Sequence, residues 1–296
     1  MKTFFLTLFF MSYSCLAGSG TDVRPVYTAK TIKIAVIDTG FDFNSKWEKL
    51  GKDSDGRQLR KPKLCNEGHK DFTGTGIQDT MGHGTHVTGI IAKFAEDADY
   101  CIVVIKFYDV GAIPTDNFRN SAVALSYAYN LGVDMINYSG GGVEFALDEY
   151  LAVKKLLDRG VVFIAAAGNE KSVNNYKILK VDLQYSYKTA GSKAVYQYKP
   201  YFINIVTGEI VSKEPIAYYP AAYDARVISV ANVELNVKTK QWDFASSSNR
   251  GDAINFNEKG VKVLSILPHN STGYMTGTSQ AAPTRAGKML KMWNNK

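Results

Sequence analysis

Three separated segments of the chain contain an aspartate, a histidine and a serine, in that order. They are Ile34-Ala-Val-Ile-Asp38-Thr-Gly40, Gly82-His83-Gly84-Thr85-His86-Val-Thr-Gly89 and Thr276-Gly277-Thr278-Ser279-Gln280-Ala-Ala-Pro283. A serine hydroxyl attacks well only when a neighbouring base accepts its proton, and a carboxylate can hold that base in the required orientation. Ser279, His83 and Asp38 therefore indicate acyl transfer with a nucleophile, a base and an orienting group.

A fourth segment, Val161-Val-Phe-Ile-Ala-Ala-Ala-Gly168-Asn169-Glu170, adds a hydrogen-bond donor. The Asn169 amide could stabilise the oxyanion of a tetrahedral intermediate together with the backbone N–H of Ser279. An asparagine that only adopts a left-handed turn after Gly168 is the alternative. Ser279 likewise has the alternative role of a helix N-cap.

On these four segments the chain resembles the subtilisin-like (subtilase) serine protease family, from about residue 34 to the C-terminus. The order Asp, His, Ser is the known order in subtilisin. The resemblance implies catalytic roles for Asp38, His83 and Ser279, and an oxyanion hole formed by Asn169 and Ser279. It implies a secreted serine endopeptidase that hydrolyses peptide bonds in polypeptide substrates.

The resemblance also implies that Ser139, Gly140 and Gly141 form an edge that pairs with the backbone of an extended substrate. Family members often have leucine where this chain has Gly140. The smaller residue predicts a looser primary pocket. An ordinary glycine-rich turn is the alternative for this segment.

Other polar residues near the triad are expected to have structural roles. His86, three residues after His83, is expected to be a core histidine, and a metal site of His83, His86 and Asp79 is disfavoured because the H-E-x-x-H glutamate is missing. No metal and no organic cofactor are expected. Calcium is possible at Glu96, Asp97 and Asp99 but is not predicted, because a solvated acidic turn explains them.

Short apolar runs alternate with amphipathic stretches along the chain. We expect strands at 32–37, 101–107, 133–138, 161–167 and 226–233, and helices at 83–94, 116–131, 144–159 and 279–293. Alternating strands and helices predict an α/β fold, a three-layer parallel β-sheet flanked by helices on both faces. Asp38, Ser139 and Asn169 each follow a strand, which is where parallel sheets place their active clefts.

Residues 171–217 interrupt the family pattern with alternating polar and aromatic residues. Candidate turns at 190–192 and 207–208 predict an insertion of one or two β-hairpins. The insertion could be a surface decoration or a lid or exosite beside the substrate cleft.

Residues 1–17 have the charge, short apolar run and small-residue end of a secretory signal peptide, and 18–296 then form the peptidase domain. We expect an extracytoplasmic protein, secreted or periplasmic. A lipoprotein anchored through Cys15 is the less favoured alternative, and no stable membrane span is expected. Residues 18–30 are too few for the pro-segment that family members often carry.

Cys65 and Cys101 remain after signal removal, and an oxidising compartment permits a disulfide. In the family fold the strands near these residues are neighbours, so the resemblance implies a Cys65–Cys101 bridge. Two buried free thiols are the alternative.

The formal net charge is +7, and basic residues are frequent between Lys46 and Lys70. No ribonucleoprotein motif or zinc-finger spacing accompanies them, so we expect a solvated basic face, no nucleic-acid partner and a monomer. Two other functions stay open: a non-catalytic binding protein on a protease fold, and a serine esterase, because a triad does not name its acyl substrate.

Overall fold

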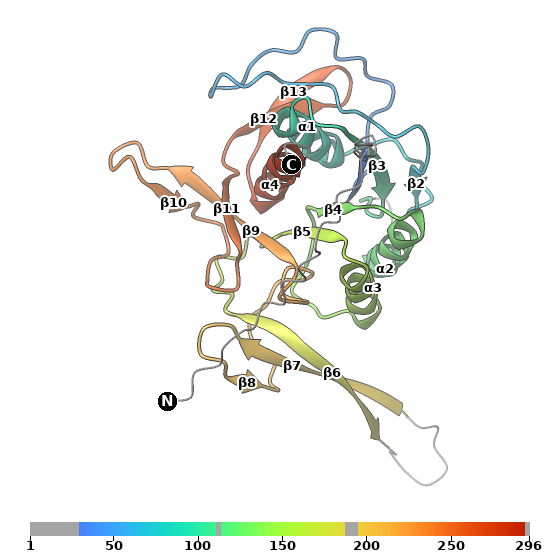
Figure 1. The fold of residues 1–296 in the computed structure, drawn as a ribbon, viewed down its shortest axis with the longest axis vertical. Helices are drawn as coiled ribbons and strands as arrows, with labels where there is room; N and C mark the ends of the chain where they lie inside the picture. The colour runs from blue at the N-terminus through green and yellow to red at the C-terminus, as the bar shows by residue number, and fades with distance from the viewer. Residues whose placement is uncertain (1–29, 111–113, 187–194, 294–296) are drawn as a thin grey trace, which may run out of the picture.

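The computed structural model describes residues 30–110, 114–186 and 195–293 (Figure 1). Its elements are β1 (Ile32–Asp38), β2 (Lys70–Asp71), α1 (His83–Ala95), β3 (Tyr100–Lys106), α2 (Pro114–Leu131), β4 (Met135–Tyr138), α3 (Leu147–Asp158), β5 (Val162–Ala166), β6 (Tyr176–Ser186), β7 (Val195–Asn204), β8 (Ile210–Val211), β9 (Ile228–Leu235), β10 (Trp242–Phe244), β11 (Phe256–Lys259), β12 (Val263–Leu267), β13 (Ser271–Met275) and α4 (Thr278–Trp293).

Within the described residues, eight strands form a central sheet in the order β10-β9-β5-β4-β1-β3-β2, with β11 also beside β9. Neighbouring strands run parallel except for β9 and β10. Strand order is not chain order, so the crossovers carry helices to both faces of the sheet, as the sequence predicts. The predicted three-layer α/β fold is confirmed.

The alternation of side chains along β1 explains the two layers of core. Ile34 and Val36 pack in the cluster that includes α1 and α4 residues, whereas Ala35 and Ile37 pack in the cluster that includes α2 and α3 residues. Successive side chains of a strand point to opposite faces, so an entirely apolar strand is buried on both sides. In Figure 1, α1 and α4 lie on one side of the strands, and α2 and α3 on the other.

The predicted elements of the central sheet form within a few residues of their expected positions. The largest difference is at α3, which begins at Leu147 and not at residue 144. Gly142 exchanges two backbone hydrogen bonds with Tyr219, and Ala146 has an extended backbone with φ −117° and ψ 115°. These contacts hold the chain extended before the helix. Strands β10 to β13 were not predicted, because segments of three to five residues carry little periodic signal.

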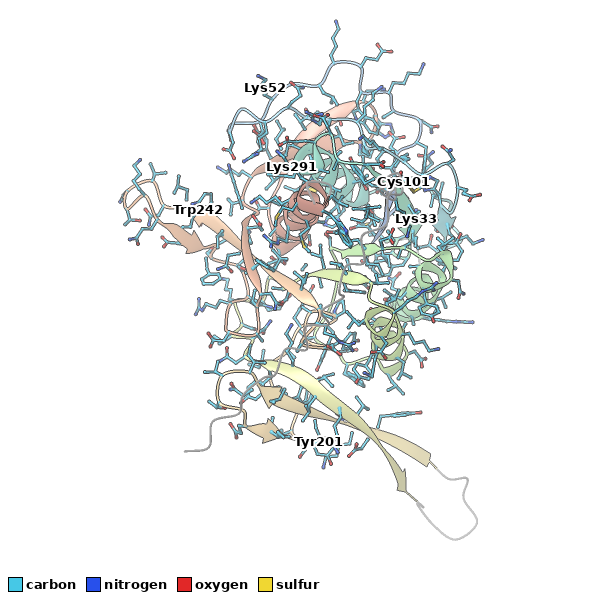
Figure 2. All side chains as sticks on the ribbon, viewed as in Figure 1. Lys33, Lys52, Cys101, Tyr201, Trp242 and Lys291 are labelled. Atoms are coloured by element: carbon cyan, nitrogen blue, oxygen red, sulfur yellow. A yellow bond between two sulfur atoms is a disulfide. The ribbon has the colours of Figure 1, made fainter. Side chains whose placement is uncertain are left out.

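The insertion forms a separate three-stranded antiparallel sheet in the order β6-β7-β8, seen at the bottom of Figure 1. The predicted turn at 207–208 joins β7 and β8, whereas 190–192 lies outside the described residues. Ile178 on β6 and Phe202 on β7 are buried in the same core cluster as α2 and α3. The base of the insertion is therefore part of the domain core, and Figure 2 shows Tyr201 on this sheet, well away from Cys101 on β3.

Backbone pairing brings the two cysteines together. Cys65 N–H donates to Ile102 O at 3.0 Å, and Ile102 N–H donates to Lys63 O at 2.8 Å. The Cys65 and Cys101 Cα atoms lie 4.8 Å apart, and their sulfurs are joined as a disulfide. His69 supports the same region, because its Nδ1 accepts from the Val104 N–H and its Nε2 donates to Cys65 O.

Residues 1–17, which the sequence predicts to be a signal peptide and which include Cys15, lie outside the described residues. Among the helices that are described, each is too short or too polar to cross a bilayer.

Candidate active site

The side chains of Asp38 and His83 meet above the end of β1. Asp38 is the last residue of β1, and His83 is the first of α1. His83 Nδ1 lies 2.7 Å from Asp38 Oδ1, and the Thr39 backbone N–H donates to the same oxygen at 2.8 Å. Since an ionised carboxylate only accepts, Nδ1 carries the proton and Nε2 is left as the free lone pair.

A close approach between α1 and the turn after β1 makes this contact possible. A Cβ on Gly84 would lie 2.2 Å from Gly40 O, so a side chain cannot occur here without separating the two segments. Asp79 connects the same parts: Thr39 Oγ1 donates to Asp79 Oδ1 at 2.9 Å, and Thr85 Oγ1 donates to Asp79 Oδ2 at 2.7 Å. Asp79 thus fixes Asp38 relative to His83. Sequence reasoning considered it only as a metal ligand.

The electrostatics of His83 suit a general base near neutral pH. Burial of the ring disfavours its protonation, but the charge of Asp38, the hydrogen bond to it and the charge of Asp79 together raise the pKa of His83 above 6.5. Asp38 itself is 4% exposed, so little water competes for its charge.

Ser279 lies in the first turn of α4, and Asn169 lies directly beside the start of that helix. Asn169 Oδ1 accepts from the Thr278 N–H at 3.0 Å, and Thr278 Oγ1 accepts from the Gly168 N–H at 3.1 Å. Because the amide oxygen of Asn169 is used by Thr278, its NH2 group remains as a donor on the other side of the amide. The N–H groups at a helix start also favour nearby negative charge.

A cavity of about 650 Å³ brings most of the predicted residues together. Its lining includes the three triad candidates and the three candidates for substrate pairing: Asp38, His83, Ser279, Ser139, Gly140 and Gly141. Asn169 is outside that lining but contacts Thr278, next to Ser279. Six residues from four distant segments thus border one space, at the carboxyl ends of parallel strands.

The looser pocket expected at Gly140 stays a prediction, and aromatic rings border this segment. Phe107 Cζ and Tyr138 Cε1 come within 3.4 and 3.5 Å of a Cβ built on Gly140, and the ring of Tyr218 lies against Gly141. A Cβ on Gly140 would make ordinary contacts with its two rings, whereas a Cβ on Gly141 would lie only 2.5 Å from Tyr218 Cε1. Sequence reasoning missed Tyr218, which lies two residues before Pro220 and directly after the insertion at 171–217.

Glu149, on α3, is a buried carboxylate that also lines this cavity. It accepts hydrogen bonds from three hydroxyls: Ser121 and Tyr138 to Oε1, and Tyr223 to Oε2 at 2.6 Å. Burial and the charge of Glu149 raise the pKa of both Tyr138 and Tyr223, so both phenols remain protonated donors at neutral pH. Sequence periodicity gave no sign of this network.

His86 is fully buried, as expected of a core histidine. Its Nε2 lies 3.0 Å from Val263 O and 3.2 Å from Gly273 O, and burial lowers its pKa to about 4, so it is neutral and its Nε2 donates. The three acidic residues considered for calcium have contacts within the chain: Glu96 pairs with Lys291, Asp97 pairs with Arg60, and Asp99 accepts from the Thr31 hydroxyl.

A doubly covered parallel sheet with an Asp–His pair and a serine at a helix start, in one cleft, defines a serine hydrolase of the subtilisin architecture. The comparisons agree: a model described as the Subtilase family matches residues 29–296, and the chain belongs to that family. It is a serine-type endopeptidase by class.

Similar proteins cover most of this chain at modest identity. It is 28% identical to the major intracellular serine protease of Bacillus subtilis (strain 168), over 88% of this chain and 67% of that one. It is 27% identical to subtilisin E of the same organism, over 88% of this chain and 55% of the relative, and 26% identical to subtilisin-like protease 2 of Plasmodium falciparum (isolate 3D7), of which it spans only 17%.

Among solved structures, the fold is similar to that of a cold adapted subtilisin-like serine proteinase. The TM-score is 0.59 at 19% identity, over 90% of this chain and 76% of the other. The prenylagaramide maturation protease PagA has a TM-score of 0.55 at 18% identity, over 88% of this chain and 75% of that one. At these identities the likeness concerns the fold alone.

Proposed function

We propose that this protein hydrolyses peptide bonds through a triad of Asp38, His83 and Ser279. His83 Nε2 accepts the Ser279 proton as the serine oxygen attacks the carbonyl carbon. The Asn169 amide and the Ser279 backbone N–H donate to the resulting oxyanion. His83 then protonates the leaving amine, and water repeats the sequence to release the acyl group.

The 2.7 Å contact between His83 Nδ1 and Asp38 Oδ1, in a cavity that Ser279 also lines, is the observation that carries this proposal. It fixes the tautomer in which Nε2 can accept a proton. All chemical steps use side chains and backbone groups of the chain, so we propose no metal or organic cofactor. Ser139, Gly140 and Gly141 are proposed to pair with an extended polypeptide substrate.

Fluorophosphonate labelling of the mature chain tests the nucleophile, with Ser279→Ala as the variant and Ser265→Ala as the control. Ser265 is buried on β12, where its hydroxyl donates to His86 O. Labelling and casein cleavage should both disappear in Ser279→Ala and persist in Ser265→Ala. A folded wild-type chain that does not label would indicate a binding protein, and ester cleavage without peptide cleavage would indicate an esterase.

We also propose export of residues 18–296 after removal of 1–17, with the protein acting as a monomer. Export is supported by the signal-like N-terminus and by two cysteines placed for a disulfide. Intact-mass measurement of the exported protein tests the cleavage site. A lipid adduct on Cys15 would replace this proposal with a lipoprotein.

For the insertion we propose a role in recognising large substrates. Ile178 N–H donates to Ala222 O at 2.9 Å, and Lys177 Nζ donates to Ala221 O at 2.5 Å. β6 thus supports the segment that carries Tyr218 into the cavity. Replacing 183–198 by an Asn-Gly turn keeps Ile178 and Phe202 and should reduce casein cleavage much more than cleavage of a short peptide. Equal losses would refute the exosite.

A further inference from the structure

The ring of Tyr218 lies between two glycine segments that border the reacting groups. A Cβ on Gly141 would lie 2.5 Å from Tyr218 Cε1, and a Cβ on Gly168 would lie 2.7 Å from Tyr218 Cδ2. These are opposite edges of the ring, so the two backbones enclose it. Both glycines have positive φ, 151° and 100°, and neither position accepts a side chain while the ring is present.

The same two segments flank the place where the substrate carbonyl must bind. Gly168 precedes Asn169, and its N–H donates to Thr278, which precedes Ser279. Gly141 and Ser279 line one cavity. A reactive substrate has its carbonyl carbon about 3 Å from the Ser279 oxygen and its carbonyl oxygen directed toward Asn169. The side chain of the residue that carries this carbonyl then lies against the space between the Gly141 and Gly168 backbones, which we call the recess.

That recess is filled from within the protein. Tyr218 is 9% exposed and also lines the cavity, so its ring forms the wall that an incoming side chain meets. The following residue is fixed to the substrate-pairing segment: Tyr219 N–H donates to Gly142 O at 2.8 Å, and Gly142 N–H donates to Tyr219 O at 3.0 Å. Withdrawal of the ring by a backbone shift would break both bonds.

The phenol stays neutral in this position. Burial and the charges of Glu170 and Glu149 raise the pKa of Tyr218 far above its usual value. A neutral aromatic ring offers a substrate side chain contact area but no charge. Exclusion by volume is therefore the main effect that this residue can have.

We propose that Tyr218 closes the recess beside Ser279 and restricts the substrate residue that supplies the acyl carbonyl to a small side chain, glycine or alanine. The inference rests on the proposed function and adds its substrate preference. An open recess of this kind would accept leucine or phenylalanine. Here such a side chain would have to displace an enclosed ring.

Peptides that differ only at that residue, carrying glycine, alanine, leucine or phenylalanine, test the proposal. In the wild type, kcat/KM for alanine should exceed that for phenylalanine by about 100-fold or more. Tyr218→Gly should raise the phenylalanine value by at least about 10-fold and change the alanine value much less. Tyr218→Phe, the matched control, keeps the ring and should keep the wild-type order.

A second measurement needs no variant: peptide boronates ending in the alanine or phenylalanine analogue should inhibit the wild type with the same order of preference. A wild type that prefers phenylalanine or leucine, or an unchanged order in a folded Tyr218→Gly variant, overturns the proposal. If the folded wild type neither labels with fluorophosphonate nor cleaves any peptide, the proposed function fails and this inference with it. Labelling and cleavage without a preference for small residues overturn the inference alone.

Discussion

His83 Nδ1 lies 2.7 Å from Asp38 Oδ1, although 45 residues separate them in the chain. The contact joins the end of a buried strand to the start of a helix that packs across it. Burial disfavours protonation of both rings, but the charge of Asp38, the hydrogen bond to it and the charge of Asp79 together outweigh burial at His83. The pKa of His83 is therefore raised, while that of His86, three residues on, is lowered to about 4 by burial. Two histidines of one helix thus have opposite protonation behaviour.

The pH dependence of hydrolysis should report this contact. Only neutral His83 can accept the Ser279 proton, and its pKa is raised above 6.5, so kcat/KM should fall as pH drops through a value above 6.5. Asp38→Asn should move this limb to lower pH and reduce kcat by about 10⁴-fold. The measurement is a pH–rate profile of both proteins with one peptide, and an unmoved limb would contradict His83 as the base.

Asn169→Ala should lower kcat by roughly 10²–10³-fold with little change in KM, because the amide donates only to the developing oxyanion. This magnitude is the one known for the corresponding asparagine of subtilisin. The control is Asn175→Ala, on the insertion side of the same loop. Loss of folding would obscure the result, because Asn169 also accepts from the Thr278 N–H. Asn169→Asp keeps that acceptor, and it should be equally slow because its carboxylate repels the oxyanion.

Lys177 should make stability depend on pH. Its Nζ is buried and donates to Ala221 O, and burial lowers its pKa from 10.5 to about 7. Between these values the unfolded chain binds a proton that the folded chain does not, so stability rises with pH across this window. The cost of burying Lys177 is fully present below pH 7.

In the Ser279→Ala background, Lys177→Met should remove this dependence. Compared with that double variant, the Ser279→Ala protein that keeps Lys177 should gain up to about 1.4 kcal/mol of unfolding free energy per pH unit from pH 7 to 10. Urea unfolding at several pH values measures it. Lys180→Met, on the exposed side of the same strand, should keep the wild-type slope, and parallel curves for Lys177→Met would refute the assignment.

Removing the Cys65–Cys101 disulfide, which spans 36 residues, should cost about 2–4 kcal/mol of unfolding free energy, from the freedom gained by the unfolded chain. The double variant Cys65→Ser/Cys101→Ser is compared with the parent by urea unfolding in the Ser279→Ala background. Peptide mapping without reduction should recover the linked peptides. Alkylated thiols at both positions in the native protein would show that the bond does not form.

Glu149→Ala should destabilise the protein by about 2–4 kcal/mol, because three buried hydroxyls, those of Ser121, Tyr138 and Tyr223, lose their acceptor. Glu149→Gln keeps one acceptor oxygen and should cost less. Thermal unfolding of both variants measures the difference. Small and equal losses of stability in the two variants would mean that water in the cavity accepts the hydrogen bonds of these hydroxyls.

The sequence by itself determined the class of fold and the chemical groups. Apolar strands such as 32–37 can only be buried on both faces, so the parallel sheet and its helices followed from local patterns. The Gly-His-Gly and Gly-Thr-Ser segments identified two of the triad candidates. Glycine stands there because the backbone must come close to another segment or begin a helix, and such local requirements can be recognised in the sequence.

Only the tertiary structure decided what surrounds those groups. Tyr218 fills the recess beside Gly141 because a distant segment crosses there, and Glu149 has its acceptor role because hydroxyls from α2, β4 and the 218–223 segment converge on it. Neither contact leaves a periodic signal, since each depends on how separate elements pack. Local sequence fixes which residues can react, whereas long-range packing fixes the shape of the space in which they do so.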